Sequence, residues 1–538
     1  MPPKRKSPRA SKAQKRARPT STRGSARASA SSAAPAPATA PAGERGRTAE
    51  QSEAALPPHE RSFEYVCGRI VKIYATSARP DYSMPWQMKR QTKSTSTGFV
   101  ISHRRIVTNA HCVAYQTSLQ VRRQGTARKV TARLVAAGHD CDLAILTVDD
   151  DSFWRDAEHD FEAHPLELGG LPELQTRVTV VGFPTGGDNI CITAGVVSRL
   201  DMQIYTHSAT NLLAIQIDAA INSGNSGGPA FHNGVVIGIA FETLDDAENV
   251  GYIIPIPVLE HFLADVASPG PYRGFGNGAF YYQSLENVHL RAAVGAKPRH
   301  SGVAVSRILP LSHAASQLRP GDVVLELDGH AIADDGTVAF RNAERIAFTN
   351  LIAAKYVGDA MKLRVLRGGK ERAVSVKVSP IDPLVPRQMY ERTATYFVWA
   401  GLVFTVLSEP FMFSEFGKDW EWKGPVRLVS KCLNGEKKDA DEECVVLSQV
   451  LSHACNVGYE PASFGSQQVE SVNDTKVRNV RHLMQLIESC RKPFVTLKVV
   501  SQKMIVLATK DAEEATREVL RVHNIAHNKS VDLREETA

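Results

Sequence analysis

The sequence predicts an all-β unit followed by two smaller α+β modules, behind a disordered basic tail. Three observations lead to this fold class. The chain has 538 residues, enough for about three or four domains of roughly 150 residues each. Residues 59–268 carry many short Val- and Ile-rich runs broken by Gly, Asn, Asp and Pro, a pattern typical of strands. The stretch 266–278 is rich in Pro and Gly and predicts a linker into a different module.

Composition disfavours a wholly disordered chain. The fractions of 43% hydrophobic and 22% charged residues are ordinary for globular proteins. The most apolar run, residues 396–407, is shorter than the roughly 20 residues that cross a bilayer, so we interpret it as buried core and expect no membrane partner. The cysteines form no CxxC pair, and no secretory leader is visible. We therefore expect free thiols in a reducing compartment, with neither a metal site nor disulfides.

The N-terminal tail, residues 1–58, has almost no large apolar side chains and is predicted to be disordered. Residues 1–30 hold ten Lys or Arg and no Asp or Glu; since the whole chain is +7, the remainder sums to 7 − 10 = −3. Basic clusters at 4–6 and 15–18 have the spacing of a bipartite nuclear localisation signal, which predicts a nuclear import receptor as partner. A chloroplast or mitochondrial transit peptide is the alternative. Nucleic-acid binding is disfavoured because the remainder is acidic.

The unit 59–268 has no long helical period before about residue 255. A double barrel or a sandwich is therefore expected. The expected strands lie in the segments 66–75, 96–101, 105–110, 177–183, 212–218 and 234–241.

Three motifs in this unit carry chemistry together. GNSGGP (224–229) places Ser226 in a glycine turn whose backbone N–H groups can converge on one point. RIVTNAHC delivers His111 at a strand end, and HDCDLAIL begins a strand with Asp142. Each motif alone has an ordinary structural interpretation. Their chain order, His, Asp, Ser, is that of chymotrypsin-type double barrels.

VTNAHC, DLAIL and DAAINSGNSGGPAF resemble the Deg/HtrA serine proteases over about residues 65–265. The resemblance implies an all-β chymotrypsin-like double β-barrel in which Ser226 is the nucleophile, His111 the general base and Asp142 the residue that orients it. It also implies an oxyanion hole formed by the N–H groups of Gly224 and Ser226, with Asn225 shaping the turn. Asp140 is the weaker candidate acid, expected to be a solvated loop residue.

The substrate pocket is expected to be small and apolar, because no acidic residue precedes the serine turn. Cleavage after Val, Ile or Ala is therefore predicted. The expected pocket residues are Ala220, Ile221, Gly238, Ile239 and Ala240.

Residues 272–383 resemble a PDZ domain, on the strength of the strand, helix, Gly-Asp turn and strand pattern in 301–332. Such domains bind a peptide as an added strand, and the loop 273–280 is the expected carboxylate receiver. A module that merely spaces or assembles the protease is the alternative. Residues 384–538 resemble a degenerate second PDZ domain that contacts other subunits or its sister domain, with a terminal helix over 510–527.

The full arrangement resembles the nuclear branch of plant and algal Deg proteases. The resemblance implies an ATP-independent, homo-oligomeric serine endopeptidase that needs no cofactor and degrades unfolded, damaged or specific regulatory proteins. A catalytically silent chaperone or scaffold of the same fold is the alternative function.

Overall fold

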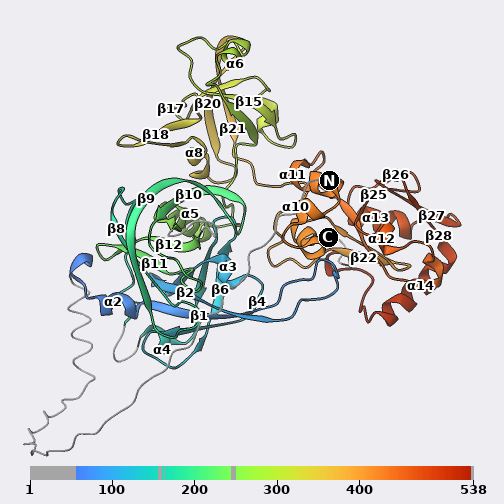
Figure 1. Cartoon of the computed structure of the whole chain (residues 1–538), viewed down its shortest axis with the longest axis horizontal. Helices are drawn as coiled ribbons and strands as arrows, with labels where there is room; N and C mark the ends of the chain where they lie inside the picture. Colours follow the sequence, from blue (N-terminus) through green and yellow to red (C-terminus); the bar gives the residue numbers. More distant parts are fainter. Residues whose placement is uncertain (1–55, 156–159, 163, 244–249, 535–538) are drawn as a thin grey trace, which may run out of the picture.

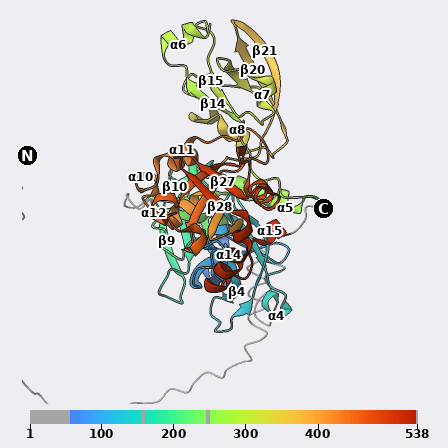
Figure 2. The ribbon, with the colours of Figure 1, turned by 90° about the vertical axis from the view of Figure 1, so that its right-hand side faces the viewer.

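The computed structural model describes residues 56–155, 160–162, 164–243 and 250–534. Nearly the whole predicted tail, including both basic clusters, lies outside these residues. Figure 1 shows three parts: a β unit in blue to green, a first α+β module in yellow-green above it, and a second module in orange to red beside it. The view in Figure 2, turned by 90°, keeps the first module at the end of the molecule and the second against the β unit.

The first half of the β unit is a seven-stranded sheet in the order β5-β4-β1-β2-β3-β7-β6. Its strands pack because their apolar residues alternate toward one core, as with Ile73, Val100 and Leu119, which are at most 2% exposed. The strands are β1 (Ile70–Ser77), β2 (Thr92–Ile101), β3 (Arg105–Thr108), β4 (Gln116–Arg123), β5 (Val130–Thr131), β6 (Arg133–Gly138) and β7 (Leu143–Thr147). The helices are η1 (Pro58–Glu60), α2 (Phe63–Gly68), α3 (Ala110–Val113) and α4 (Asp151–Trp154).

The second half is a closed barrel in the order β10-β13-β12-β11-β8-β9. Its strands are β8 (Arg177–Gly182), β9 (Cys191–Tyr205), β10 (Thr210–Ile217), β11 (Pro229–His232), β12 (Val235–Thr243) and β13 (Gly251–Pro255). The first long helix, α5 (Ile256–Ala267), follows directly. The all-β prediction is confirmed, with one difference: the first half is an open sheet rather than a hydrogen-bonded barrel.

The first α+β module is built on a sheet in the order β14-β15-β16-β20-β21. The strand, helix, Gly-Asp turn and strand predicted from the sequence are present, and Asp322 of the turn is buried against Arg367 at 2.6 Å. The strands are β14 (Phe280–Ser284), β15 (Val303–Ile308), β16 (Val323–Leu327), β17 (His330–Ala331), β18 (Thr337–Arg341), β19 (Glu344–Ala347), β20 (Ala360–Arg367) and β21 (Lys370–Lys377). The helices are α6 (Val288–Ala293), α7 (Ala314–Gln317) and α8 (Thr349–Ala353).

The loop 273–280 does not fit the carboxylate-receiving role expected of it. The N–H groups of Arg273 and Gly274 donate to Asp265, at 2.8 Å each. The N–H of Phe275 donates to Asp140 at 2.7 Å, and that of Asn277 to the Ser379 carbonyl at 2.9 Å. Because these donors are already satisfied within the chain, most of the loop has no N–H group left to offer an incoming carboxylate.

The second module has the sheet order β22-β23-β24-β25-β27-β28. Residues 396–407 form its first hairpin and are almost fully buried, which confirms that they are core. The strands are β22 (Tyr396–Trp399), β23 (Leu402–Val406), β24 (Val445–Val450), β25 (Gln467–Val472), β26 (Thr475–Lys476), β27 (Phe494–Val499) and β28 (Met504–Ala508). Among the described residues, no helix anywhere in the chain combines the length and apolar character needed to cross a membrane.

Helices of the second module include three that the sequence analysis did not predict, inserted between β23 and β24: α9 (Glu409–Phe416), α10 (Trp420–Lys423) and α11 (Val426–Asn434). The others are η2 (Ala454–Asn456), α12 (Pro461–Phe464), α13 (Val480–Glu488), α14 (Thr509–Val522) and α15 (Val531–Arg534). The terminal helix therefore exists but ends at Val522, where His523 caps it and Asn524 adopts a positive φ of 53°. All eight cysteines are unpaired.

Candidate active site

His111 and Asp142 are brought together by the adjacent strands β3 and β7. Strand β3 ends at Thr108, and the buried Asn109 donates from Nδ2 to the Asp142 carbonyl at 3.0 Å. The Ala110 N–H donates to the same carbonyl at 3.2 Å. These bonds fix the start of α3, so that the His111 side chain projects beside the carboxylate.

The Asp142 carboxylate makes two hydrogen bonds to His111. Oδ1 accepts from the His111 N–H at 2.9 Å, and Oδ2 accepts from ring Nδ1 at 2.7 Å. The side chain of Asp142 is 2% exposed, whereas that of His111 is 35% exposed. With Nδ1–H donated to the carboxylate, Nε2 is left as the basic atom on the accessible edge of the ring.

The charges of this pair reinforce each other. Burial acts against the imidazolium, but the Asp142 carboxylate outweighs it and holds the pKa of His111 well above its ordinary value. Burial acts against the Asp142 carboxylate as well, and the neighbouring His111 still lowers the pKa of Asp142. The arrangement therefore stabilises a protonated His111, the state a general base reaches after accepting a proton.

Ser226 lies on a turn that requires glycine on both sides. Gly224 and Gly227 have positive φ angles of 99° and 82°. Thr97 of β2 holds the turn, because its N–H donates to the Ser226 carbonyl at 3.0 Å and its Oγ1 donates to the Gly224 carbonyl at 2.7 Å. A Cβ on Gly227 would lie 2.2 Å from the Thr97 carbonyl oxygen. Close packing against β2 thus fixes the position of Ser226.

The predicted oxyanion donors have the hydrogen-bonding state that such a role needs. The Asn225 N–H donates to the Asn222 carbonyl at 2.9 Å and shapes the turn. Within the described part of the chain, the N–H groups of Gly224 and Ser226 donate to no protein acceptor. Two such donors on one turn, on either side of Asn225, can bind a developing oxyanion.

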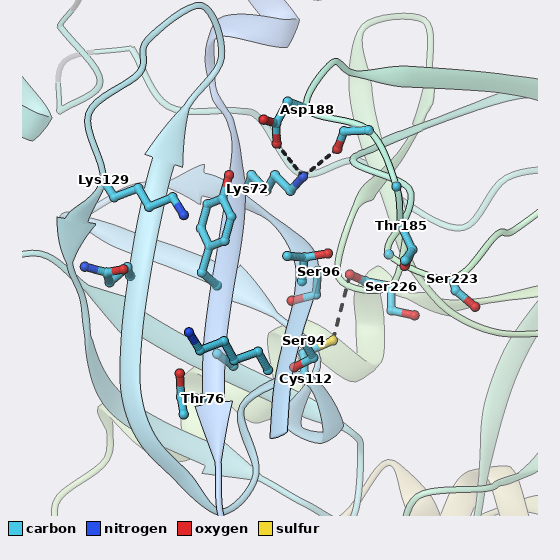
Figure 3. A pocket seen from close by; sticks show the side chains of 18 of the residues that line it. Lys72, Thr76, Ser94, Ser96, Cys112, Lys129, Thr185, Asp188, Ser223 and Ser226 are labelled. Atoms are coloured by element: carbon cyan, nitrogen blue, oxygen red, sulfur yellow. Dashed lines mark hydrogen bonds and ion pairs between the residues drawn. The ribbon is translucent and has the colours of Figure 1, made fainter. Parts of the chain in front are cut away.

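His111 and Ser226 line the same cavity, of about 980 Å³. Figure 3 shows the position of Ser226 at its edge, next to Ser223 and Cys112. Among the hydrogen bonds of the described residues, none joins His111 Nε2 to Ser226 Oγ. Catalytic hydrogen bonds are often long without substrate and shorten in the complex. The association of His111 with Ser226 is therefore indicated by the cavity that both residues line.

The predicted pocket residues do not line this cavity. Ile239 of β12 is fully buried in the core, and Gly238 is buried beside it. Ala240 pairs with the serine turn, accepting from the Gly227 N–H at 2.8 Å and donating to the Gly228 carbonyl at 2.9 Å. Ala220 is exposed and Ile221 is 8% exposed. The small apolar pocket for the residue before the cleaved bond therefore stays a prediction. Ile239 packs in the core of the β unit.

The sequence analysis missed a cluster of three rings that begins beside His111 with His207. The His207 ring is 6.1 Å from that of His111 and 5.2 Å from that of His139, with a 2.9 Å contact between His139 Nδ1 and His207 Nε2. Tyr390, from the segment that joins the two α+β modules, stacks on His139 at 4.2 Å. His139 lies three residues before Asp142, which is the only sequence signal for this cluster; nothing near Tyr390 indicated it.

Asp140 is not the solvated loop residue that was expected. Its carboxylate accepts from the Tyr272 hydroxyl and from the Phe275 N–H, at 2.7 Å each. Burial raises the pKa of Asp140 despite these bonds. Asp140 therefore ties the loop that carries Asp142 to the linker that leads into the first α+β module.

A buried carboxylate, an imidazole and a serine on a glycine turn, carried by two all-β halves, define the class of trypsin-like serine proteases. The family of trypsin-like peptidase domains matches residues 96–239, and two PDZ domain families match residues 235–378 and 385–532.

Comparison with known proteins gives the family. The chain is 41% identical to Protease Do-like 2, chloroplastic, of Arabidopsis thaliana, over 89% of this chain and 76% of that protein. It is 39% identical to Protease Do-like 4, mitochondrial, of the same plant, over 89% of this chain and 88% of that protein. The solved structure of the HtrA-type protease AlgW with a decapeptide is 22% identical over 60% of this chain and 98% of that one, with a TM-score of 0.45. The chain belongs to the Deg/HtrA family of Do-like serine proteases and carries two PDZ domains.

Proposed function

We propose that the chain is an ATP-independent endopeptidase of unfolded, damaged or specific regulatory proteins, with His111, Asp142 and Ser226 as its catalytic triad. The proposal is carried by the 2.7 Å contact between His111 Nδ1 and the Asp142 carboxylate, beside the cavity that Ser226 also lines. Ser226 Oγ attacks the scissile carbonyl while His111 Nε2 takes its proton and later passes it to the leaving amine. Asp142 stabilises the imidazolium in between.

The oxyanion of the tetrahedral intermediate is bound by the N–H groups of Gly224 and Ser226, with Asn225 holding the turn. Their lack of a protein acceptor within the described residues supports this role. The residue before the cleaved bond is received beside Ala220, Ile221 and β12, where a small apolar side chain is favoured. A cleavage profile dominated by Lys or Arg at that position would contradict this part of the proposal.

Degradation of casein without ATP or added metal tests the triad. Wild type should cleave, and Ser226→Ala should lose cleavage while Ser501→Ala, at an exposed serine of the second module, keeps it. Equal cleavage by Ser226→Ala would show that another group is the nucleophile. If neither wild type nor variant cleaves, the silent chaperone or scaffold gains support, and suppression of aggregation becomes the activity to measure.

The tail is proposed to be a targeting signal. Its two basic clusters favour import into the nucleus through an import receptor, whereas the names of the two plant relatives favour the chloroplast or mitochondrion. A fluorescent protein fused to residues 1–58 distinguishes these destinations. Nuclear fluorescence that is lost when residues 4–6 and 15–18 are neutralised supports the nucleus, and organellar fluorescence excludes it.

The domain limits proposed are 59–268 for the protease, 272–383 for the first PDZ domain and 384–538 for the second. Assembly into a homo-oligomer through these domains is part of the same proposal. Light scattering of the purified chain measures the subunit number, and a mass equal to one chain of 58.7 kDa at all concentrations would contradict assembly.

A further inference from the structure

The cavity beside Ser226 continues across one face of the first sheet. The register places Tyr74 of β1 between Thr95 of β2 and Gln120 of β4, and these three residues line the cavity. The next row, two residues along, consists of Lys93, Thr76 and Ser118, which line it as well. Residues two apart on a strand point to the same face, so the sheet offers the cavity a continuous polar floor.

The lining is positively charged. It contains Lys72, Lys93 and Lys129 against one acidic residue, Asp188, a formal charge of 3 − 1 = +2 with His111 neutral. Asp188 is already paired, with Lys72 Nζ at 2.9 Å and with Arg122 Nη2 at 3.3 Å. Figure 3 shows Lys72 joined to Asp188 on the side of Thr185 and Ser226, with Lys129 across the cavity.

Lys93 and Lys129 are the two remaining cations of the lining. Within the described residues, neither side chain is within ion-pair distance of an Asp or Glu. The Nζ of Lys129 lies 3.6 Å from the ring centroid of Tyr74, a cation–π contact that holds the ammonium at the cavity wall without neutralising it. The cavity therefore presents two free positive charges within one cleft, where fields are stronger than on an open surface.

The position of the cavity relative to the cleaved bond follows from the proposed function. The residue before that bond is assigned to Ala220, Ile221 and β12, none of which lines the cavity. The cavity lies instead on the side of Ser226 that carries Cys112, Ser94 and Ser96. The part of the substrate that follows the cleaved bond is therefore the part that passes over Lys93 and Lys129.

We propose that this cavity binds the substrate residues that follow the cleaved bond, and that Lys93 and Lys129 select acidic side chains there. This inference rests on the proposed function. It adds a charge preference on the leaving-group side to the apolar preference expected before the bond.

Two fluorogenic peptides test the proposal. They share the same residues up to and including the first one after the cleaved bond, and continue with Glu-Asp in one peptide and Gln-Asn in the other. Wild type should show about a tenfold higher kcat/KM for the acidic peptide at low ionic strength, falling toward equality in high salt. In Lys93→Gln/Lys129→Gln the ratio of the two values should approach one, and in Lys93→Arg/Lys129→Arg the preference should be retained.

Lys503→Gln is the matched control, because Lys503 also lies over an aromatic ring, that of Phe464 at 5.1 Å, but in the second module. It should keep the wild-type ratio. Equal kcat/KM for both peptides in wild type, or an unchanged ratio in the double Gln variant, would overturn the proposal. If neither the peptides nor casein are cleaved, the proposed function is contradicted instead.

Discussion

The two flanks of His111 are built in opposite ways. One flank is filled with rings: His207 lies against it, His139 lies against His207, and Tyr390 stacks on His139 from the segment between the two PDZ domains. The other flank opens into a polar, cationic cavity of about 980 Å³. The filled flank lies on the side of the buried Asp142 and restrains the imidazole, whereas the open flank leaves room for a substrate. One side of the His111 ring is therefore packed, and the other side is accessible.

The largest expected effect comes from removing the charge on the filled flank. Asp142→Asn keeps the shape of the side chain but loses the carboxylate that orients His111 and raises its pKa. We expect kcat on casein to fall by about 10⁴-fold. The acid limb of the wild-type pH–rate profile should lie above the ordinary histidine range, since activity needs neutral His111, and should move to lower pH in the variant. If the acid limb did not move, Asp142 would not be the cause of the raised pKa of His111.

A second prediction compares a glycine packed under Ser226 with an open one at the edge of the cavity. Gly227→Ala places a Cβ 2.2 Å from the Thr97 carbonyl oxygen at a φ of 82°, so the free energy of unfolding should fall by about 3–5 kcal/mol. Gly186→Ala, on the open flank, has a similar φ of 92° but meets no atom within 4 Å, and should lose only about 1–2 kcal/mol. Urea titrations measure both values. Equal losses would mean that backbone conformation alone, rather than packing under Ser226, decides the cost.

A third prediction concerns Tyr390. Its ring stacks on His139 with an interplanar angle of 6°, and its hydroxyl donates to the His207 carbonyl at 3.4 Å. Loss of such a ring contact is worth about 1 kcal/mol, so Tyr390→Ala should open the segment from the protease five- to tenfold more often. Trypsin cleavage at the exposed Arg387 and Arg392 should accelerate by that factor. Tyr390→Phe keeps the ring and should remain near wild type; equal acceleration in both variants would assign the effect to the hydroxyl.

A fourth prediction is a pH dependence of stability on the filled flank. Burial, followed by repulsion from His207, lowers the pKa of His139 to about 4, against about 6.5 in the unfolded chain. Above pH 6.5 His139 is neutral in both states and contributes nothing. Between pH 6.5 and about 4 only the unfolded chain takes up the proton, so the free energy of unfolding falls as pH falls. Urea titrations of His139→Phe should show a shallower fall over this interval; an identical slope would exclude His139 as a source.

Local patterns account for what could be predicted. Strands of the β unit follow from alternating apolar residues, and His111, Asp142 and Ser226 lie in short motifs whose chain order led to the proposed triad. The inserted helices were missed although one of them left a signal in the sequence. Leu428 and Cys432 of α11 have the i, i+4 spacing of a helix face, and both are buried in the structure.

Contacts between distant segments could not be predicted in the same way. Tyr390 and His139 meet only because the second PDZ domain packs against the protease, and no local periodicity encodes that. Asp140 looked solvated for the same reason, since its partners Tyr272 and Phe275 come from the linker. Ile239 was assigned to a pocket from its place in a motif, whereas the alternation of β12 directs its side chain into the core.

The linker contacts of Asp140 bear on where the chain can be shortened. A protease truncated after residue 268 would lose Tyr272 and Phe275, leaving the Asp140 carboxylate without two of its donors. It would also strip the buried Asp265 of the Arg273 and Gly274 N–H groups and His261 of the Phe275 ring stacked on it at 4.2 Å. A shortened protease intended for biochemical work should therefore end beyond Phe275, so that the aspartate two positions before the proposed triad acid keeps its partners.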